Sequence, residues 1–174
     1  MRKLSNSIAG MIFEKRMKRI DNIRNHPFEC QRKTFQYLIT QLAQTEYGKR
    51  FKIRTNTKYQ DFSSRVPLVR YEDIYPMISR MMMGEKNVLW PGKVSWFSKS
   101  SGTTNERSKF IPVPYINLRY NHYKGARDTM NLVYSRMPNS TIFGAKSIIL
   151  GGSLERHVDN YKCRIGDVSA VMMY

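Results

Sequence analysis

The sequence predicts an α/β fold, in which a mostly helical segment over 1–90 precedes strands and a helix over 91–174. Three observations lead to this prediction. The 174 residues suffice for one domain with a hydrophobic core. Apolar residues make up 41% of the chain and aromatic residues 12%, as is typical of a globular protein. Apolar residues recur at helical spacing in the first half, whereas short strand-like runs appear in the second.

Two amphipathic helices are predicted at the start of the chain. The first covers 4–23, where apolar side chains recur at helical spacing with basic side chains between them. The second covers 27–45, because Pro27 suits the first position of a helix and an apolar stripe follows it. Gly48 is the predicted stop signal for this helix, and loop with short helix is expected over 49–70.

A third helix and a pair of strands are predicted in the middle of the chain. The helix begins near Tyr71 and ends at Gly84, and it carries Pro76 in its first turn, where the backbone amide has no partner to lose. Apolar runs predict strands over 94–97 and 109–113. The polar segment between these strands is therefore expected to be held at both of its ends.

The last third of the chain is predicted to contain a long helix and a further strand. The helix covers 115–134, and the turn-forming residues Pro-Asn-Ser follow at 138–140. An apolar run over 145–150 is a strand candidate. The segment 166–174 is apolar and stops with no cap or turn, so we expect the chain to be cut inside an element.

Positive charge dominates the composition. The formal net charge is +17, with 13 Lys and Arg against 4 Asp and Glu in residues 1–54, and 17 against 9 in residues 55–174. Such a chain attracts nucleic acid, anionic lipid or anionic small molecules. No run of five basic residues occurs, so the charge is typical of a solvated face, or of a larger protein whose acidic part lies elsewhere. A basic nucleic-acid-binding module stays open as the alternative function.

The cysteines, histidines and apolar runs exclude several classes of protein. Cys30 and Cys163 are isolated and form no CxxC, which favours a reducing, cytoplasmic location without disulfides. The three histidines are scattered, so no zinc site is predicted. No apolar run approaches the roughly 20 residues that span a bilayer, and we expect no membrane partner. The start of the chain lacks a secretory signal, although its basic amphipathic pattern could imitate a mitochondrial presequence.

The polar segment SKSSGTTNERSKF, residues 98–110, is the candidate functional site. Its glycine can adopt a positive φ, so that successive backbone amides form an anion-binding nest. Its serine and threonine hydroxyls can donate to phosphate oxygens, and a lysine adds positive charge. Because no Walker A or GxGxxG pattern is present, a polar hairpin turn is the alternative interpretation. The candidate phosphate-binding residues are Ser100, Ser101, Gly102, Thr103, Thr104 and Lys109.

Six segments of the chain resemble one family, in the order in which they occur. WFSKSSGTTNERSKFIP, residues 96–112, is similar to the first ATP-binding motif of the auxin-responsive-promoter family, and the chain looks like its bacterial branch. Members of that family are acyl-acid amido synthetases, which are ligases of the adenylate-forming, luciferase-like superfamily. The other segments are TEYGK at 45–49, VPLVRYED at 66–73, GEKNVLWP at 84–91, HYKG at 122–125 and GDVSA at 166–170.

The resemblance implies a two-step reaction that uses ATP and Mg²⁺. A carboxylic acid first attacks the α-phosphate of ATP, which gives an acyl-adenylate and pyrophosphate. An amine, typically that of an amino acid, then attacks the activated carbonyl and releases AMP. By the family pattern, Ser100 to Thr104 would hold the β- and γ-phosphates of ATP, and Lys109 would make an auxiliary phosphate contact.

The resemblance also implies that this chain is the N-terminal part of one adenylate-forming domain. Arg119, His122 and Tyr123 would approach the acyl-acid pocket, although a surface arginine and a half-buried histidine are the alternative. Asp167 could reach Mg²⁺ or act as a cap. The residues that grip adenine and ribose, and the C-terminal lid domain, would lie in the missing C-terminal part of the same enzyme. We therefore assign no catalytic residue and no metal ligand, expect no specific nucleic-acid partner, and expect this fragment to be inactive alone.

Overall fold

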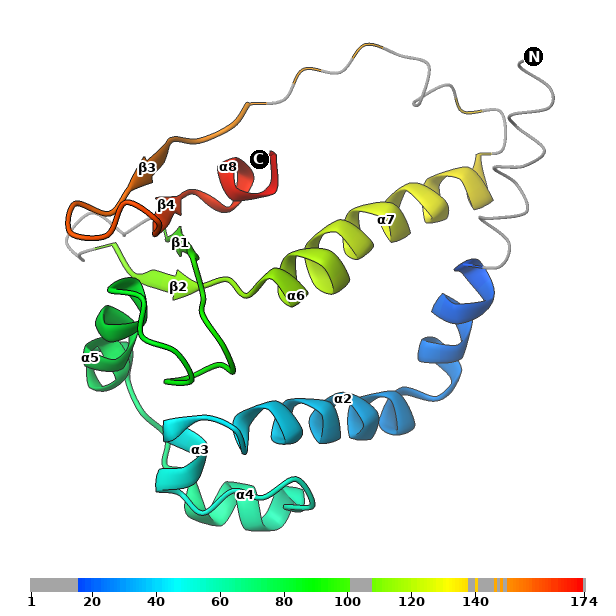
Figure 1. Cartoon of the computed structure of the whole chain (residues 1–174). Coiled ribbons are helices and arrows are strands. Elements are labelled where there is room, and N and C mark those ends of the chain that lie inside the picture. Colours follow the sequence, from blue (N-terminus) through cyan, green and yellow to red (C-terminus); the bar gives the residue numbers. More distant parts are fainter. Residues whose placement is uncertain are drawn as a thin grey trace.

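The computed structural model describes residues 16–100, 108–137, 140, 146, 148 and 150–173, which form helices and a small mixed sheet (Figure 1). Among these described residues, no helix combines the length and the apolar character needed to cross a membrane. A helical stretch covers 16–25. The elements after it are α2 (Pro27–Leu42), α3 (Glu46–Arg50), α4 (Tyr59–Arg65), α5 (Tyr71–Met82), β1 (Trp96–Lys99), β2 (Phe110–Pro112), α6 (Tyr115–Asn117), the π-helix η1 (Leu118–His122), α7 (Tyr123–Arg136), β3 (Leu154–Arg156), β4 (Arg164–Gly166) and α8 (Val168–Met173).

The helices predicted in the first half of the chain are present with changed ends. α2 begins at Pro27 as predicted and ends earlier than predicted, at Leu42. α5 begins at Tyr71, and Gly84 follows its end with a φ of +98°, a conformation that favours glycine. The predicted first helix is helical over 16–25, and its earlier residues lie outside the described part of the chain.

Two predictions about single residues in these helices are wrong. Gly48 does not stop a helix, because it lies inside α3, where the Thr45 hydroxyl caps the first turn by accepting its amide at 3.0 Å. A Cβ atom at Gly48 would lie 1.9 Å from the Leu42 carbonyl oxygen, so the close approach of α3 to the end of α2 requires glycine. Pro76 lies in the second turn of α5 rather than the first, and its missing amide leaves the Glu72 carbonyl without an α-helical partner.

In the part of the chain that the structure describes, four short strands form one sheet in the order β2-β1-β4-β3. β1 pairs antiparallel with β2 and parallel with β4, so that Phe97 lies opposite Pro112 on one side and Ile165 on the other. β3 pairs antiparallel with β4. The predicted strand pair around the polar segment is confirmed by β1 and β2. The strand predicted over 145–150 lies largely outside the described residues, and none of its described positions is in a strand.

Apolar side chains pack on both faces of the sheet. Phe97 of β1 is completely buried in a cluster that α5 shares. Its neighbour Trp96 points to the opposite face, because successive side chains of a strand alternate, and packs there against Leu118 of η1 and Val171 of α8. α5 therefore covers one face of the sheet, and η1 with α8 covers the other. The buried members of the α5 cluster are Ile78, Met81, Met82, Val88, Val94, Phe97 and Cys163.

The helix predicted over 115–134 is present as three consecutive pieces, α6, η1 and α7, which end at Arg136. Figure 1 shows this long helix extending away from the sheet. Its middle piece, η1, is π-helical, a form that recurs at functional sites and changes the direction of the side chains around it. Asp128 on α7 forms an ion pair with Arg16, which ties the helical stretch 16–25 to α7.

Candidate functional site

Hydrogen bonds join the two ends of the candidate phosphate loop where β1 ends and β2 begins. The Ser100 amide donates to the Lys109 carbonyl oxygen at 2.9 Å, and the Lys109 amide donates to Ser100 Oγ at 3.1 Å. We call this pair, Ser100 with Lys109, the loop base. In the adjoining register position, Lys99 lies opposite Phe110. The loop therefore leaves and re-enters the sheet at one closed base, an arrangement that suits a hairpin turn and a phosphate cradle alike.

The structure brings together two of the six candidate phosphate-binding residues. Ser100 and Lys109 meet at the loop base, where they present a hydroxyl group and an ammonium group. These two groups fit an anionic phosphate, since both donate hydrogen bonds and one carries positive charge. The assignment of the loop to the β- and γ-phosphates of ATP stays a prediction. The other four candidates lie outside the described residues: Ser101, Gly102, Thr103 and Thr104.

Tyr71, the first residue of α5, contacts the strand that follows the loop base. Its Oη accepts the Phe110 amide at 2.8 Å and lies 3.4 Å from the Phe110 carbonyl oxygen. Burial raises the pKa of the Tyr71 phenol above its ordinary value, which keeps the hydroxyl group protonated at neutral pH. Sequence reasoning missed Tyr71 as a site residue, because its partner in this contact is a backbone amide 39 positions away.

The Lys109 side chain lies beside the first turn of α5. Its Nζ is 4.0 Å from Glu72 Oε1 and 5.7 Å from the centroid of the Tyr71 ring. Both charged side chains are more than a third exposed, so this ion pair contributes little to stability. A phosphate group could therefore replace Glu72 as the neighbour of Lys109 at small cost in free energy.

The three residues predicted to approach the acyl acid lie on the helix that follows β2. Arg119 and His122 belong to η1, and Tyr123 begins α7. Arg119 is exposed, and its guanidinium carbon lies 5.5 Å from the centroid of the Tyr120 ring, whereas His122 is half-buried. These positions fit a surface arginine with a half-buried histidine, and they also leave the Arg119 guanidinium accessible to a substrate carboxylate.

Asp167 lies at the same edge of the sheet as the loop base. Because β1 and β4 are parallel, Asp167 follows β4 at the edge where Ser100 follows β1. A Cβ atom at Gly152 would lie 1.9 Å from Asp167 Oδ2, so the carboxylate packs directly on this glycine. The Asp167 carbonyl oxygen accepts the Val171 amide at 3.0 Å, which places Asp167 at the N-cap position of α8. Among the described residues, no group of three or more His, Cys, Asp or Glu could hold a metal ion.

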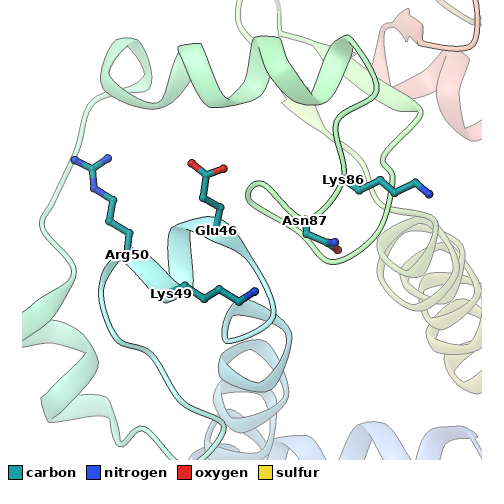
Figure 2. A pocket seen from close by; sticks show the side chains of 5 residues that line it. All are labelled: Glu46, Lys49, Arg50, Lys86 and Asn87. Carbon is teal, nitrogen blue, oxygen red and sulfur yellow. The ribbon is translucent and has the colours of Figure 1, made fainter.

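An open hollow of about 440 Å³ lies beside α3 and the loop after α5 (Figure 2). Figure 2 shows Glu46 and Arg50 rising from α3, with Asn87 on the loop that faces it. The first two amides of α3 are already occupied, because Glu46 and Tyr47 donate to the carbonyl oxygens of Asn87 and Val88 at 2.7 and 3.2 Å. These bonds hold α3 against the loop and leave neither amide for an anion. The lining residues are Glu46, Lys49, Arg50, Lys86 and Asn87.

The hollow is separate from the loop base. Arg80, near the end of α5, donates to the carboxylates of both Glu46 and Glu85. Tyr71, which contacts β2 beside the loop base, lies nine residues earlier on the same helix. At a rise of 1.5 Å per residue, about 14 Å of helix separates the two positions. The hollow and the loop base therefore lie at opposite ends of α5.

Comparison with known proteins identifies the same family over most of the chain. The model of the GH3 family N-terminal domain matches residues 16–157. The indole-3-acetic acid-amido synthetase GH3.6 of Arabidopsis thaliana is 33% identical over 94 residues, which are 53% of this chain and 15% of that protein. The jasmonoyl-L-amino acid synthetase JAR6 of Nicotiana attenuata is 30% identical over 100 residues, which are 57% of this chain and 17% of that protein.

A solved structure shares the fold. The chain superposes on the GH3.15 acyl acid amido synthetase with a TM-score of 0.75 and 21% sequence identity. The superposition covers 90% of this chain and 28% of that one. The chain thus has the fold of one portion of that synthetase, and it spans less than a third of the length of each protein it is compared with.

Proposed function

The chain belongs to the GH3 family, and on this basis we propose that it supplies the phosphate-binding part of an ATP-dependent acyl-acid amido synthetase. Membership confirms the family resemblance of the sequence motifs. The observation that carries the proposed function is the closed loop base of Ser100 and Lys109, which presents the SSGTT segment between two paired strands. The named relatives are amido synthetases and an amino acid synthetase, which supports the same class of reaction here.

The proposed reaction forms an amide in two steps. A carboxylate oxygen attacks the α-phosphorus of ATP, and the bond from that phosphorus to the bridging oxygen of pyrophosphate breaks. The amine nitrogen then attacks the carbonyl carbon of the acyl-adenylate, the bond to AMP breaks, and the amine releases a proton. Positioning and charge neutralisation dominate catalysis of such phosphate displacements. Bound Mg²⁺ would neutralise phosphate oxygens during the first step.

The proposed task of this chain is to hold the β- and γ-phosphates while pyrophosphate departs. Amide and hydroxyl groups from Ser100 to Thr104 would donate to the phosphate oxygens, and Lys109 would add a positive charge. The paired strands support this proposal, because they fix the positions of Ser100 and Lys109, the two ends of the loop, relative to each other. The groups that bind adenine and ribose, and the lid that closes the site, are proposed for the portion of the relatives that this chain does not span.

We propose a carboxylic acid, and an amine or amino acid, as the other substrates. Arg119, His122 and Tyr123 are the side chains proposed to face the acid, and the π-helical form of η1 supports this proposal. GH3.6 and JAR6 are named for different acids yet match this chain at similar identity, so the identity of the acid is a question for experiment. A bacterial origin and a cytoplasmic location stay predictions, and the two named relatives are plant proteins.

Exchange of labelled pyrophosphate into ATP tests the proposed function. The assay uses the complete gene product that contains this chain, identified by reading the gene beyond codon 174, with a panel of carboxylic acids. Lys109→Ala is expected to raise the KM for ATP about tenfold, because the phosphates lose a charge-assisted contact. Lys58→Ala, which changes a lysine at the N-terminal end of α4, is the matched control and should leave this KM unchanged.

Two results would count against the proposed function. Absence of exchange with every acid, together with absence of MgATP binding, would overturn it. Tight, salt-sensitive binding of DNA or RNA by the same protein would favour the basic nucleic-acid-binding module instead.

A further inference from the structure

We propose that Tyr71 is a positioning residue for the phosphate loop, because the first turn of α5 braces the strand that carries the downstream end of the loop. This inference rests on the proposed function, in which the loop binds the phosphates of ATP. The Tyr71 phenol contacts the backbone of Phe110, the residue after Lys109, and would therefore act on the phosphates through β2.

The direction of the backbone groups in β2 explains why a side chain is needed there. Among the strands of the described residues, β2 lies at the edge of the sheet, so one of its sides has no neighbouring strand there. Lys109 directs both its amide and its carbonyl towards Ser100, on the β1 side. Since successive residues of a strand alternate in direction, the amide and carbonyl of Phe110 point outward. Tyr71 Oη lies 2.8 Å from that amide nitrogen and 3.4 Å from that carbonyl oxygen, where a further strand would otherwise pair.

The contact between Tyr71 of α5 and Phe110 of β2, here called the brace, is rigid because α5 packs on the core along its length. Its buried residues Ile78, Met81 and Met82 belong to the cluster that also contains Phe97 of β1. Tyr71 and Phe110 both pack against this cluster.

At the start of the helix, the Arg70 amide donates to Asp73 Oδ2 at 2.8 Å, which closes the first turn. A continuous path of packed and hydrogen-bonded groups therefore runs from the core, through α5 and Tyr71, to the loop base. The Tyr71–Phe110 hydrogen bond and the apolar packing of α5 are neutral, so salt screens these links of the path little.

Loss of the Tyr71 phenolic hydroxyl should specifically lower the affinity of the loop for phosphate groups. Functional groups need to be held to within about 0.5 Å of their productive positions. Without the Tyr71 oxygen, the outward amide of Phe110 loses its acceptor, and β2 is freer to move with Lys109. The adenosine end of the nucleotide should be unaffected, because the residues proposed for it lie in another part of the enzyme.

Tyr71→Phe in the complete gene product, with Tyr75→Phe as the matched control, tests this inference. Tyr75 lies one turn later on α5, its ring centroid is 5.7 Å from that of Tyr71, and its side chain is exposed. Titration calorimetry with magnesium pyrophosphate, MgATP and AMP gives three affinities for each variant. Tyr71→Phe should weaken binding of pyrophosphate and ATP about tenfold and leave AMP unchanged, whereas Tyr75→Phe should change none of the three.

A second readout requires no nucleotide. Hydrogen exchange at the Phe110 amide should accelerate in Tyr71→Phe and stay unchanged in Tyr75→Phe. An unchanged exchange rate in Tyr71→Phe would contradict the brace, whatever the nucleotide affinities show.

The remaining outcomes separate this inference from the proposed function. Unchanged pyrophosphate affinity in Tyr71→Phe, with normal binding by the unmodified protein, would overturn the positioning role alone. Equal weakening of pyrophosphate and AMP would indicate a general structural role and would also overturn it. If the unmodified protein binds neither MgATP nor pyrophosphate, the proposed function fails and the inference fails with it.

Discussion

The two ends of α5 are attached to the rest of the chain by different kinds of contact. At the N-terminal end, the half-buried Tyr71 phenol accepts the Phe110 amide of the strand that follows the phosphate loop. At the C-terminal end, the Arg80 guanidinium, whose side chain is 39% exposed, bridges Glu46 of α3 and Glu85. The middle of the helix is buried in the core that both ends share.

The two kinds of contact differ in how well they can hold a binding loop in place. A neutral hydrogen bond in a half-buried site is directional and little affected by salt. Exposed ion pairs are weak, and salt screens them. The end of α5 that meets the phosphate-loop strand therefore keeps its geometry across solution conditions. The end that meets α3 is held by the ion pairs of Arg80, whose strength depends on salt and pH.

The largest expected effect comes from removing the support that both ends share. Met81 is 1% exposed in the core cluster. Met81→Ala should lower the free energy of unfolding by about 2–5 kcal/mol, because burial is lost and a cavity remains. Met83 lies two residues later, is 53% exposed and is the matched control. Met83→Ala should change the free energy of unfolding by less than about 0.5 kcal/mol. Equal denaturant midpoints for the two variants would contradict the buried position of Met81.

The reactivity of Cys163 reports on the same core. Burial raises the pKa of its thiol from 9.0 to about 11, so the group is protonated and poorly nucleophilic near neutral pH. Mass spectrometry after iodoacetamide treatment should therefore find Cys30 labelled well before Cys163. Met81→Ala should accelerate labelling of Cys163 and leave the rate at Cys30 unchanged. Equal labelling rates at both cysteines in the unmodified protein would show that the core does not bury Cys163.

A smaller effect is expected at the cap of α3, the helix that carries Glu46 to Arg80. The fully buried Thr45 hydroxyl accepts the Gly48 amide at 3.0 Å and donates to the Leu42 carbonyl oxygen at 2.7 Å. Thr45→Ala should cost about 1–2 kcal/mol of unfolding free energy, because both bonds are lost. Thr45→Ser retains the hydroxyl group and should recover most of this loss. Similar unfolding free energies for the alanine and serine variants would rule out the capping role.

Arg80→Gln should have a smaller effect that salt removes. The Arg80 ion pairs are exposed, so their loss should lower the melting temperature slightly at low ionic strength and hardly at all at high ionic strength. The melting temperature of Tyr71→Phe, relative to the unmodified protein, should not depend on salt. A salt-independent deficit in Arg80→Gln would remove the distinction between the two ends of α5.

Acid should weaken the same ion pairs of Arg80 with Glu46 and Glu85. The hydrogen bonds from Arg80 hold the pKa of both Glu46 and Glu85 below the ordinary value of 4.5. Their stabilising effect is therefore complete above pH 4.5 and is lost as the pH falls through the lowered pKa values. Melting temperatures measured down this range should fall less steeply in Arg80→Gln than in the unmodified protein. Parallel curves for the two proteins would show that these carboxylates are not coupled to Arg80.

The parts of the fold that could be predicted are those decided by local pattern. α2 and α5 each follow one periodic stripe of apolar residues, and β1 and β2 follow apolar runs. The helical position of Gly48 could not be predicted, because it depends on how closely the Leu42 carbonyl approaches. β3 and β4 are three residues each and contain charged side chains. Pairing with neighbouring strands, and not an apolar residue pattern, therefore determines that these segments form strands.

The candidate site likewise has one part that could be predicted from local sequence and one part that could not. The loop from Ser100 to Lys109 could be located from its composition and its family resemblance. Tyr71 could not be assigned to it, because its bond joins residues 39 positions apart and its partner is a backbone amide. Backbone partners leave no trace in the residue types of a single sequence, so only the folded arrangement of an edge strand beside a helix start reveals the contact.

Whether Tyr71 positions the phosphate loop is decided by the KM for ATP in the acid-dependent exchange reaction, compared between Tyr71→Phe and Arg80→Gln. The complete gene product should catalyse exchange only with a suitable carboxylic acid present. Tyr71→Phe should then raise the KM for ATP about tenfold, and Arg80→Gln should leave it unchanged. An equal rise in both variants, or no rise in Tyr71→Phe, would contradict the account that the N-terminal end of α5 positions the phosphate loop.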